Sequence, residues 1–597
     1  MDIMGRVEAL RKIMAEKGID IYIIPTADFH QSEYVGEHFK AREFITGFTG
    51  SAGTAVITAE EAGLWTDGRY FIQAAGQLAG TPVELRKMGQ PDVPTIEEYL
   101  EKTLPEGGTI GFDGRVISVR EGQKYEKLAE EKHGKIQYQE DLIDAVWKER
   151  PEISRKPVFA LGMEYAGESA ADKLKRIRKE MEKHHADVHV LTTLDDICWM
   201  LNIRGDDVDY FPLALSYALI TKEGVELYID ENKLDKPLKE TLAADGVKLH
   251  PYHDIYEDIK GLQAESALLL DESKLNYALY KSIPESTGKI NKPNPEILFK
   301  AVKNEVEIAN IRKAQIKDSV AHVRFMKWLK ENVGRIRITE ISASDKLDEF
   351  RMEMGNFLRP SFAPISAFGA HAAMAHYSAA PETDAELKEG SFLLTDTGAG
   401  FYEGSTDITR TYALGEVSQE MKDDFTLVAI SNLSLASVRF LKGSSGLTLD
   451  YAARKPFWDR GMDYNHGTGH GVGYLLNIHE GPAGIRWKYR AGEIQELEQG
   501  MVLTDEPGIY VEGSHGIRLE NELLVCEGEK NEYGQFMYFD AITLIPFDLD
   551  AINPDMMTSG ERRLLNDYHK KVYETLIPYL TEEEKDWLKV YTRAIEE

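Results

Sequence analysis

The chain has 597 residues, more than one hydrophobic core usually organises, and its 42% hydrophobic and 29% charged residues are typical of a globular protein. A formal net charge of −31 argues against a surface for nucleic acid or for anionic membranes, because both need clustered lysine and arginine. Only Cys198 and Cys526 could form a disulfide, and no signal peptide or membrane span is recognisable, so the sequence predicts a cytoplasmic protein.

The first 300 residues repeat a pattern of helix followed by strand. Apolar residues at helical spacing near the N-terminus precede a strand, and the same pattern returns 167 residues later, where Met181 takes the place of Met14. Alternation of this kind makes layered sheets, so we predict two tandem α/β domains of related build, over residues 1–155 and 156–300.

A third region begins with a long charged amphipathic helix over 304–331. From about residue 390 the sequence pattern becomes typical of strands separated by glycine-containing turns, and the pattern of the last fifty residues is helical. We predict one domain over 301–545 and a helical extension over 546–597.

Five residues of the third region stand beside turn or strand signals and can bind cations: Asp396, Asp407, His470, Glu506 and Glu520. A hairpin centred near Phe401 and Tyr402 would place the two aspartates opposite each other, and two carboxylates that close repel unless protons or cations intervene. In "GIRLENELL", strand alternation would put Arg518, Glu520 and Glu522 on one face.

Oxygen-rich sites with one or two imidazoles suit divalent Mn, Fe, Co or Zn. Four carboxylates and one neutral histidine balance the charge of two such ions, which is the requirement for a two-metal hydrolase. Each residue taken alone is more typical of a cap, a solvent-exposed strand position or a tight turn. The three histidines of "HHADVH" (184–189) lack a carboxylate pair nearby, and we interpret them as structural.

The five residues, in this order and with separations of 11, 63, 36 and 14, resemble the ligand set of the pita-bread metallopeptidases, which include methionine aminopeptidase, prolidase and aminopeptidase P. The flanks "HGTGHGVG", "TDEPGIY" and "GIRLEN" resemble the aminopeptidase P (Xaa-Pro aminopeptidase) family. The N-terminal "SEYVGEHFKAREFITGFTGSAGTAVIT" and "LWTDGRYFIQA" resemble its long, three-domain form. The resemblance implies an α/β (α+β) fold with two creatinase-like N-terminal domains and a C-terminal pita-bread domain.

The resemblance also implies how the metals are held. Asp396 is expected to bind one metal through both oxygens, Asp407 and Glu520 to bridge the two ions, and His470 with Glu506 to complete the shell of the other. Two divalent ions are implied, Mn²⁺ in the first place, with Zn²⁺ or Co²⁺ as alternatives.

The catalytic roles are implied in the same way. His376 and His479 are expected to hydrogen-bond the substrate carbonyl or the developing oxyanion, and Arg518 to orient carboxylates and help bind substrate. Glu506 is expected to relay a proton to the proline nitrogen after a hydroxide bridging the metals attacks the carbonyl. His466 is placed near the site without a ligand role.

The implied function is hydrolysis of the N-terminal Xaa-Pro bond of peptides with proline at position two, by a homodimer. The alternatives are prolidase, which cleaves dipeptides, and a non-catalytic peptide-binding relative. A creatinase-like amidinohydrolase is the weakest option, because it shares the fold without this metal set.

Overall fold

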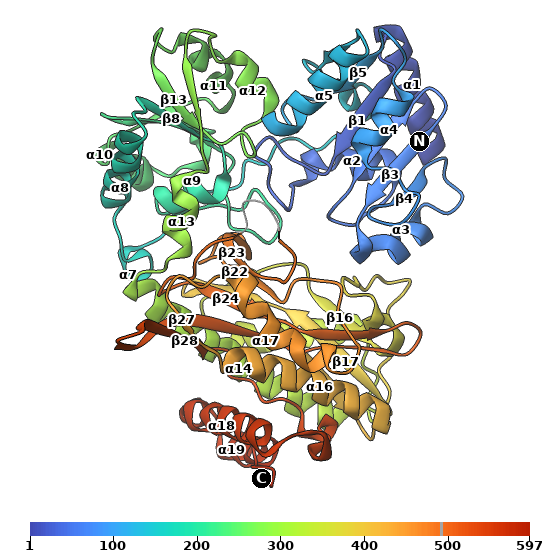
Figure 1. Ribbon diagram of the computed structural model, residues 1–597, viewed down its shortest axis with the longest axis vertical. Coiled ribbons are helices and arrows are strands. Elements are labelled where there is room, and N and C mark those ends of the chain that lie inside the picture. Colours follow the sequence, from blue (N-terminus) through green and yellow to red (C-terminus); the bar gives the residue numbers. More distant parts are fainter. Residues whose placement is uncertain (490–493, 597) are drawn as a thin grey trace. The chain divides into compact units, whose positions relative to one another are not determined.

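The computed structural model describes residues 1–489 and 494–596. These form two compact units, one of residues 1–161 with 169–296 and the other of residues 162–168 with the chain from 297 onward. We call them the first and the second unit; Figure 1 labels their elements.

The first unit contains two six-stranded sheets. The strand order of one sheet is β4-β3-β2-β1-β5-β6, and its strands are β1 (Ile21–Pro25), β2 (Thr54–Thr58), β3 (Ala62–Thr66), β4 (Glu84–Lys87), β5 (Thr109–Phe112) and β6 (Lys135–Gln137). The order of the other is β12-β11-β10-β8-β13-β14, from β8 (Val188–Leu191), β10 (Tyr217–Thr221), β11 (Val225–Tyr228), β12 (Val247–His250), β13 (Ala267–Leu270) and β14 (Gly288–Asn291).

The two sheets have the same topology. In each, the strand after the first helix pairs antiparallel with the next strand and parallel with the fifth, and the edge pairs are parallel. The helices that open the two domains, α1 (Ile3–Lys17) and α8 (Ala170–Lys183), bury equivalent methionines, Met14 and Met181. The predicted repeat is therefore present as two copies of one sheet design.

The remaining elements of the first unit are short. Its other helices are α2 (Ala41–Thr46), α3 (Phe71–Gln77), α4 (Ile96–Thr103), α5 (Val119–Glu131), α6 (Ile143–Val146), α9 (Leu194–Met200), α10 (Lys236–Ala244), α11 (Ile255–Asp258) and α12 (Tyr277–Ser282). A two-stranded pair joins β7 (Phe159–Ala160) to β9 (Ile203–Arg204).

Helices of the second unit begin with α7 (Met163–Ala166). The long predicted helix is α14 (Glu305–Asn332), which starts with a capping box formed by Asn304 and Glu307. The others are α15 (Glu340–Glu353), α16 (Gln419–Ala436), α17 (Gly446–Trp458), α18 (Ser559–Leu576) and α19 (Glu582–Tyr591); α13 (Pro295–Ala301) lies at the boundary between the units. Helices α18 and α19 lie side by side at the C-terminal end (Figure 1) and contribute Leu565, Val572 and Leu588 to one apolar core with α16.

Strands of the second unit form several small sheets around one six-stranded sheet. The large sheet has the order β21-β28-β27-β24-β22-β23, from β21 (Arg439–Leu441), β22 (Gly469–Val472), β23 (His479–Ile485), β24 (Val502–Asp505), β27 (Asn521–Asn531) and β28 (Gly534–Ala541). The small sheets contain β15 (Phe357–Pro360), β16 (Ile365–Phe368), β17 (Ser391–Thr397), β18 (Ala399–Phe401), β19 (Gly404–Ser405), β20 (Ile408–Leu414), β25 (Gly508–Val511) and β26 (His515–Arg518).

Two predicted strand details are wrong. The β17–β20 hairpin pairs Asp396 with Thr409 rather than with Asp407, because its turn lies one residue later than predicted and Gly404 takes up the positive φ of 135°. Asp407 stays on the same side of the ladder, as the diagonal neighbour of Asp396. The single strand predicted through Arg518 and Glu522 is interrupted, since β26 ends at Arg518 and β27 begins at Asn521.

Among the residues that the structure describes, no helix has the length and apolar character needed to cross a membrane. The domain boundaries at 155/156, 300/301 and 545/546 stay predictions.

Candidate metal centre

The five predicted ligands come from five places in the second unit and meet at one point. Asp396 lies near the end of β17, and Asp407 directly precedes β20. His470 lies within β22, Glu506 directly follows β24, and Glu520 lies between β26 and β27. Strands of two different sheets therefore bring these five residues together.

The glycines of "HGTGHGVG" allow β22 to lie between two neighbouring strands. A Cβ on Gly469 would come within 1.9 Å of the carbonyl oxygen of Thr504, and one on Gly471 within 2.2 Å of that of Glu480. Neither position tolerates a side chain, so glycine on both sides of His470 is what lets β24 and β23 approach it.

The side-chain ligand atoms form three overlapping groups, and in each group they lie within 4.8 Å of one another. The groups are Asp396, Asp407 and Glu520; His470, Glu506 and Glu520; and Asp407, His470 and His479. The Nε2 atom of His470 is 3.4 Å from Oδ2 of Asp407 and 3.9 Å from Oε1 of Glu506. Each of the three groups is compact enough to hold a metal ion.

Burial raises the pKa values of the clustered carboxyl groups. Removal from water raises the pKa of Glu506 to about 6, although the charges of His470 and Arg518 oppose the shift. The pKa of Glu520 lies well above its usual value because of burial and then the charge of Asp407, and the pKa of Asp396 is raised by burial. So much negative charge in one place needs protons or cations.

Arg518 is the cation that the chain itself supplies. Its Nη2 donates to Oδ2 of Asp396 at 2.5 Å, and its Nε donates to Oγ1 of Thr409 at 3.2 Å. Thr409 in turn donates from Oγ1 to Oε2 of Glu520 at 2.7 Å. Arg518 therefore orients two carboxylates of the cluster, one directly and one through Thr409.

A second contact of Arg518 reaches the other histidine of the glycine-rich motif. Its Nη1 donates to the hydroxyl oxygen of Tyr510 at 2.7 Å, and that hydroxyl lies 3.0 Å from Nε2 of His466. Burial lowers the pKa of His466 to about 4, so the ring is neutral and its Nε2 accepts the Tyr510 proton. His466 thus lies near the site, as predicted, and contacts it through Tyr510 and Arg518.

His479 lies at the start of β23, and its ring packs edge-to-face on that of His470 with centroids 4.4 Å apart. His376 lies in the segment that follows β16, next to Ala375, whose carbonyl oxygen accepts from Nη2 of Arg518 at 3.4 Å. Both histidines therefore belong to segments that border the cluster.

Two contributors, Tyr510 and Thr409, were not predicted from the sequence. Tyr510 ends the motif "TDEPGIY" but was given no role there, and only the contacts of these two residues reveal them. Glu522, which alternation placed with the site, accepts from the backbone N–H of Asp407 at 2.8 Å, and burial raises its pKa well above the usual value. Alternation along "LENE" was the one available signal.

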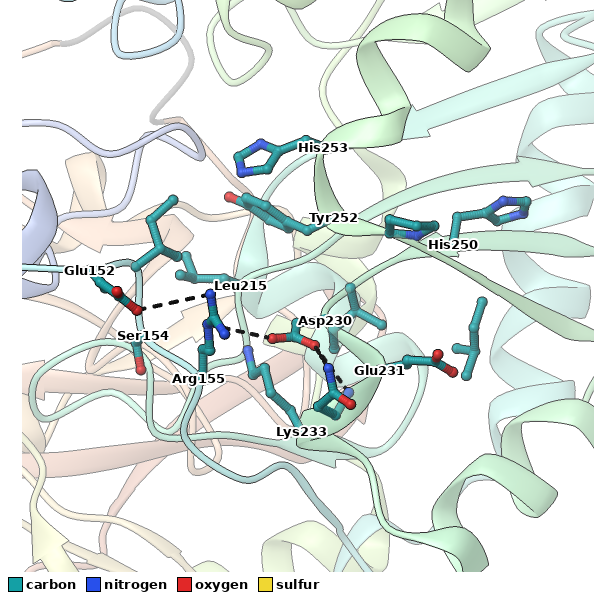
Figure 2. A pocket seen from close by; sticks show the side chains of 15 residues that line it. Glu152, Ser154, Arg155, Leu215, Asp230, Glu231, Lys233, His250, Tyr252 and His253 are labelled. Atoms are coloured by element: carbon teal, nitrogen blue, oxygen red, sulfur yellow. Dashed lines mark hydrogen bonds and ion pairs between the residues drawn. The ribbon is translucent and has the colours of Figure 1, made fainter.

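A separate cavity of about 580 Å³ lies in the first unit, at the ends of β11 and β12 (Figure 2). Its charged side chains pair with neighbours, as Figure 2 shows for Arg155, which lies 3.9 Å from both Glu152 and Asp230. None of the five predicted ligands lines it.

The histidine-rich segment "HHADVH" also belongs to the first unit. Its His189 is buried, and the Nε2 atom lies 3.3 Å from Oε2 of Glu296, in keeping with a structural role.

Comparison with protein families matches four regions of the chain. Residues 6–146 match a creatinase/prolidase N-terminal domain, and residues 149–307 match a second domain with that description. Residues 309–527 match metallopeptidase family M24, and residues 535–595 match the C-terminal region of that peptidase family. The predicted fold class, two creatinase-like domains before a metallopeptidase domain, is confirmed.

Relatives from distant organisms align over the whole chain. A probable Xaa-Pro aminopeptidase P of Sordaria macrospora is 38% identical, with 98% of each chain covered. Aminopeptidase P1 of Arabidopsis thaliana is 36% identical, with 99% of each covered.

Solved structures match either the whole chain or only part of it. An X-prolyl aminopeptidase from Caenorhabditis elegans, described as a cytosolic enzyme with a di-nuclear active site, has a TM-score of 0.94 at 33% identity, with 100% of both chains covered. An Xaa-Pro dipeptidase from Bacillus anthracis has a TM-score of 0.52 at 25% identity. The match covers 64% of this chain and 99% of the dipeptidase. The chain therefore belongs to the Xaa-Pro aminopeptidase P group of metallopeptidase family M24.

Proposed function

We propose that the protein removes the N-terminal residue from peptides that carry proline at position two, with two divalent metal ions held by Asp396, Asp407, His470, Glu506 and Glu520. It is a metal-dependent aminopeptidase and acts as a hydrolase. The observation that carries this function is the convergence of the five ligands, in a chain that matches Xaa-Pro aminopeptidases from end to end.

The donor set fits hard divalent cations. Four carboxylates and one imidazole are the ligands that Mn²⁺ and similar ions accept. The Oδ1 atom of Asp396 is buried and accepts no hydrogen bond from the residues that the structure describes. An unsatisfied buried carboxylate oxygen beside other carboxylates is stabilised by a cation. We propose Mn²⁺, with Zn²⁺ and Co²⁺ as the alternatives.

Divalent ions at such a site supply a water of lowered pKa and polarise the scissile carbonyl. The protein's own groups supply the rest. Glu506 accepts a proton and transfers it to the leaving proline nitrogen. His376 and His479 donate hydrogen bonds to the substrate carbonyl oxygen as it gains charge, and Arg518 keeps Asp396 in position.

Proline at the second position imposes two requirements. Its nitrogen has no N–H, so an enzyme for Xaa-Pro bonds cannot depend on a donor at that place, and the departing nitrogen must be protonated. Glu506 meets the second requirement. The dipeptidase alternative is disfavoured because Xaa-Pro aminopeptidases match the whole chain, whereas the Bacillus anthracis dipeptidase covers only 64% of it.

We also propose that the protein is cytoplasmic and forms a homodimer. An aromatic patch of Tyr451, Trp458 and Trp487 on the second unit supports the dimer. Tyr451 is 55%, Trp458 40% and Trp487 43% exposed, and neighbouring ring centroids lie 5.9 Å apart. Clustered exposed aromatic rings mark protein interfaces.

The test is hydrolysis by metal-free protein after addition of Mn²⁺, Co²⁺ or Zn²⁺ separately. We expect metal-dependent cleavage of Xaa-Pro-Yaa peptides, little cleavage of Xaa-Ala-Yaa, and roughly a thousandfold loss in the Glu506→Ala variant. Cleavage of Xaa-Pro dipeptides alone would favour prolidase. Absence of bound metal together with absence of cleavage would favour the non-catalytic alternative.

A further inference from the structure

A buried carboxylate at the start of α15 holds the segment that carries His376. Glu340 is fully buried, and four donors from this segment and the strand before it converge on its two oxygens. Its Oε1 accepts from the Phe368 backbone N–H at 2.7 Å and from Nδ1 of His371 at 2.9 Å, and its Oε2 accepts from the Tyr377 hydroxyl at 2.8 Å and from the Ala385 backbone N–H at 3.0 Å. We call residues 369–387 the His376 loop.

Glu340 closes the two ends of this loop onto one point. Phe368 is the last residue of β16, directly before the loop, and Ala385 lies near its other end. The backbone N–H of Glu340 donates back to the carbonyl oxygen of Ala385 at 3.1 Å, and Thr339 forms an isolated antiparallel bridge with Glu386. The two ends are thereby fixed to the first turn of α15.

The middle of the loop is fixed by the same residue. Tyr377 directly follows His376, and its hydroxyl donates to Glu340 while its ring stacks on that of His371, with centroids 4.6 Å apart and planes at 27°. Tyr377 is itself buried against Ile365 and Leu394. One side of His376 is thus attached to Glu340 through its chain neighbour.

On the metal-centre side the loop lies against β26. A Cβ on Gly516 would come within 1.8 Å of the carbonyl oxygen of Ala372, so the loop and strand are in direct backbone contact. Two residues along β26, Arg518 donates to the carbonyl oxygen of Ala375 and to Asp396. His376 therefore sits between a residue bonded to Arg518 and a residue bonded to Glu340.

We infer that Glu340 is a positioning residue for His376: it holds the His376 loop so that the imidazole meets the substrate carbonyl oxygen. The inference rests on the proposed function, because it takes the role of His376 from there. A carboxylate accepting four hydrogen bonds gives a rigid anchor, and loss of part of this set leaves buried donors unsatisfied. A shift of about 1 Å in a catalytic group is enough to cost roughly a hundredfold in rate.

The test is the Glu340→Gln variant of the full-length metal-loaded protein. Glutamine keeps the shape but presents an NH₂ group to donors, so it cannot accept all four bonds. A hydrogen bond that strengthens in the transition state affects kcat more than KM. For an Xaa-Pro-Yaa peptide we expect kcat to fall roughly tenfold to a hundredfold, with KM within about threefold and metal content unchanged.

A double-variant comparison separates positioning from general damage. If Glu340 acts through His376, adding Glu340→Gln to His376→Ala lowers kcat no further, whereas independent effects multiply. Asp548→Asn is the matched control: Asp548 is a buried carboxylate of the same unit that accepts from the Ala413 N–H at 2.8 Å and pairs with Lys330. We expect it to lower stability and leave kcat near the wild-type value.

If Glu340→Gln does not fold, Tyr377→Phe tests the inference instead, since it removes one hydroxyl that donates to Glu340 and keeps the ring. A kcat reduced severalfold at constant KM supports the inference. The inference is overturned if the folded variants keep their kcat, or if the losses multiply in the double variant. Either result would leave the proposed function intact, because the wild-type protein would still be active. Wild-type protein that leaves Xaa-Pro peptides intact would instead contradict the proposed function.

Discussion

At the scale of single residues, Arg518 links the proposed metal ligands to the rest of the site. Burial works to lower its pKa, but the neighbouring Tyr510, Asp396 and Glu506 outweigh burial and hold the pKa of Arg518 well above the usual value, so it stays charged. Its contacts to Asp396, Thr409 and Tyr510 use its planar fork of donors, a geometry that lysine cannot reproduce.

Removing the Tyr510 hydroxyl should disturb this arrangement without touching a ligand. In Tyr510→Phe, Arg518 loses one acceptor and His466 loses its donor, so we expect kcat to fall roughly tenfold to a hundredfold with metal content retained. Steady-state kinetics and metal analysis check this. Tyr412→Phe, which removes a buried hydroxyl 3.1 Å from Nδ1 of His322, is the control and should keep its kcat.

His569 on α18 should make stability depend on pH. It is buried, its Nε2 accepts from the Phe547 backbone N–H at 3.1 Å, and burial lowers its pKa from 6.5 to about 3. The unfolded chain takes up a proton as pH falls below 6.5, whereas the folded chain does not until about 3, so stability present above pH 6.5 is lost between these values.

We expect this group to reduce the free energy of unfolding by roughly 2 kcal/mol at pH 5 relative to neutral pH. Urea unfolding at several pH values measures the effect, and His569→Gln should show a flatter dependence than the wild type. The exposed His184 provides the control through His184→Gln. Equal pH dependence in all three proteins would contradict the assignment.

At the scale of elements, β23 is the strand whose placement matters most, because it begins at His479. Glu480 points to the opposite face, where it forms a buried ion pair with Lys303 directly before α14. Since side chains alternate along a strand, fixing Glu480 in the interior fixes His479 on the face of the metal cluster. Val472 pairs with His479 across the ladder, so His470, two residues away on the same face, is the diagonal neighbour of His479.

Lys303→Met should therefore destabilise the second unit by about 3 to 5 kcal/mol, because it leaves a buried carboxylate without its cation. The double change Lys303→Met with Glu480→Leu should recover most of this loss. Denaturant unfolding measures both. Lys455→Met, in an exposed pair with Asp459, is the matched control and should cost less than about 1 kcal/mol. Similar losses for the two lysines would refute the argument.

At the scale of the whole molecule, two copies of one sheet design are combined with a metallopeptidase domain. The first unit holds a cavity of about 580 Å³ but none of the five proposed ligands, which all lie in the second unit. The aromatic patch also belongs to the second unit.

Changing this patch should alter the oligomeric state. In Tyr451→Ser combined with Trp487→Ser, two rings that adjoin Trp458 are lost, so we expect sedimentation as a monomer where the wild type sediments as a dimer. Tyr533→Ser removes an aromatic ring that is 76% exposed elsewhere and should leave the dimer intact. A wild-type protein that is monomeric at micromolar concentration would rule the proposal out.

The sequence alone determined the class of the molecule and the five candidate ligands. Periodicity revealed the repeated domains and the long helix, because local side-chain spacing follows directly from helix and strand geometry. The order, spacing and flanks of the five residues singled out the ligand set through their resemblance to the pita-bread metallopeptidases.

Only the tertiary structure decided which residues other than Arg518 support the site. Tyr510, Thr409, Glu340 and Lys303 act through contacts between segments far apart in the chain, and no local pattern encodes such contacts. The register that pairs Asp396 with Thr409 was likewise beyond local reasoning, because it depends on where a glycine turn closes. Ligand identity can be read from residue type and order, whereas the positions of supporting groups follow from packing in three dimensions.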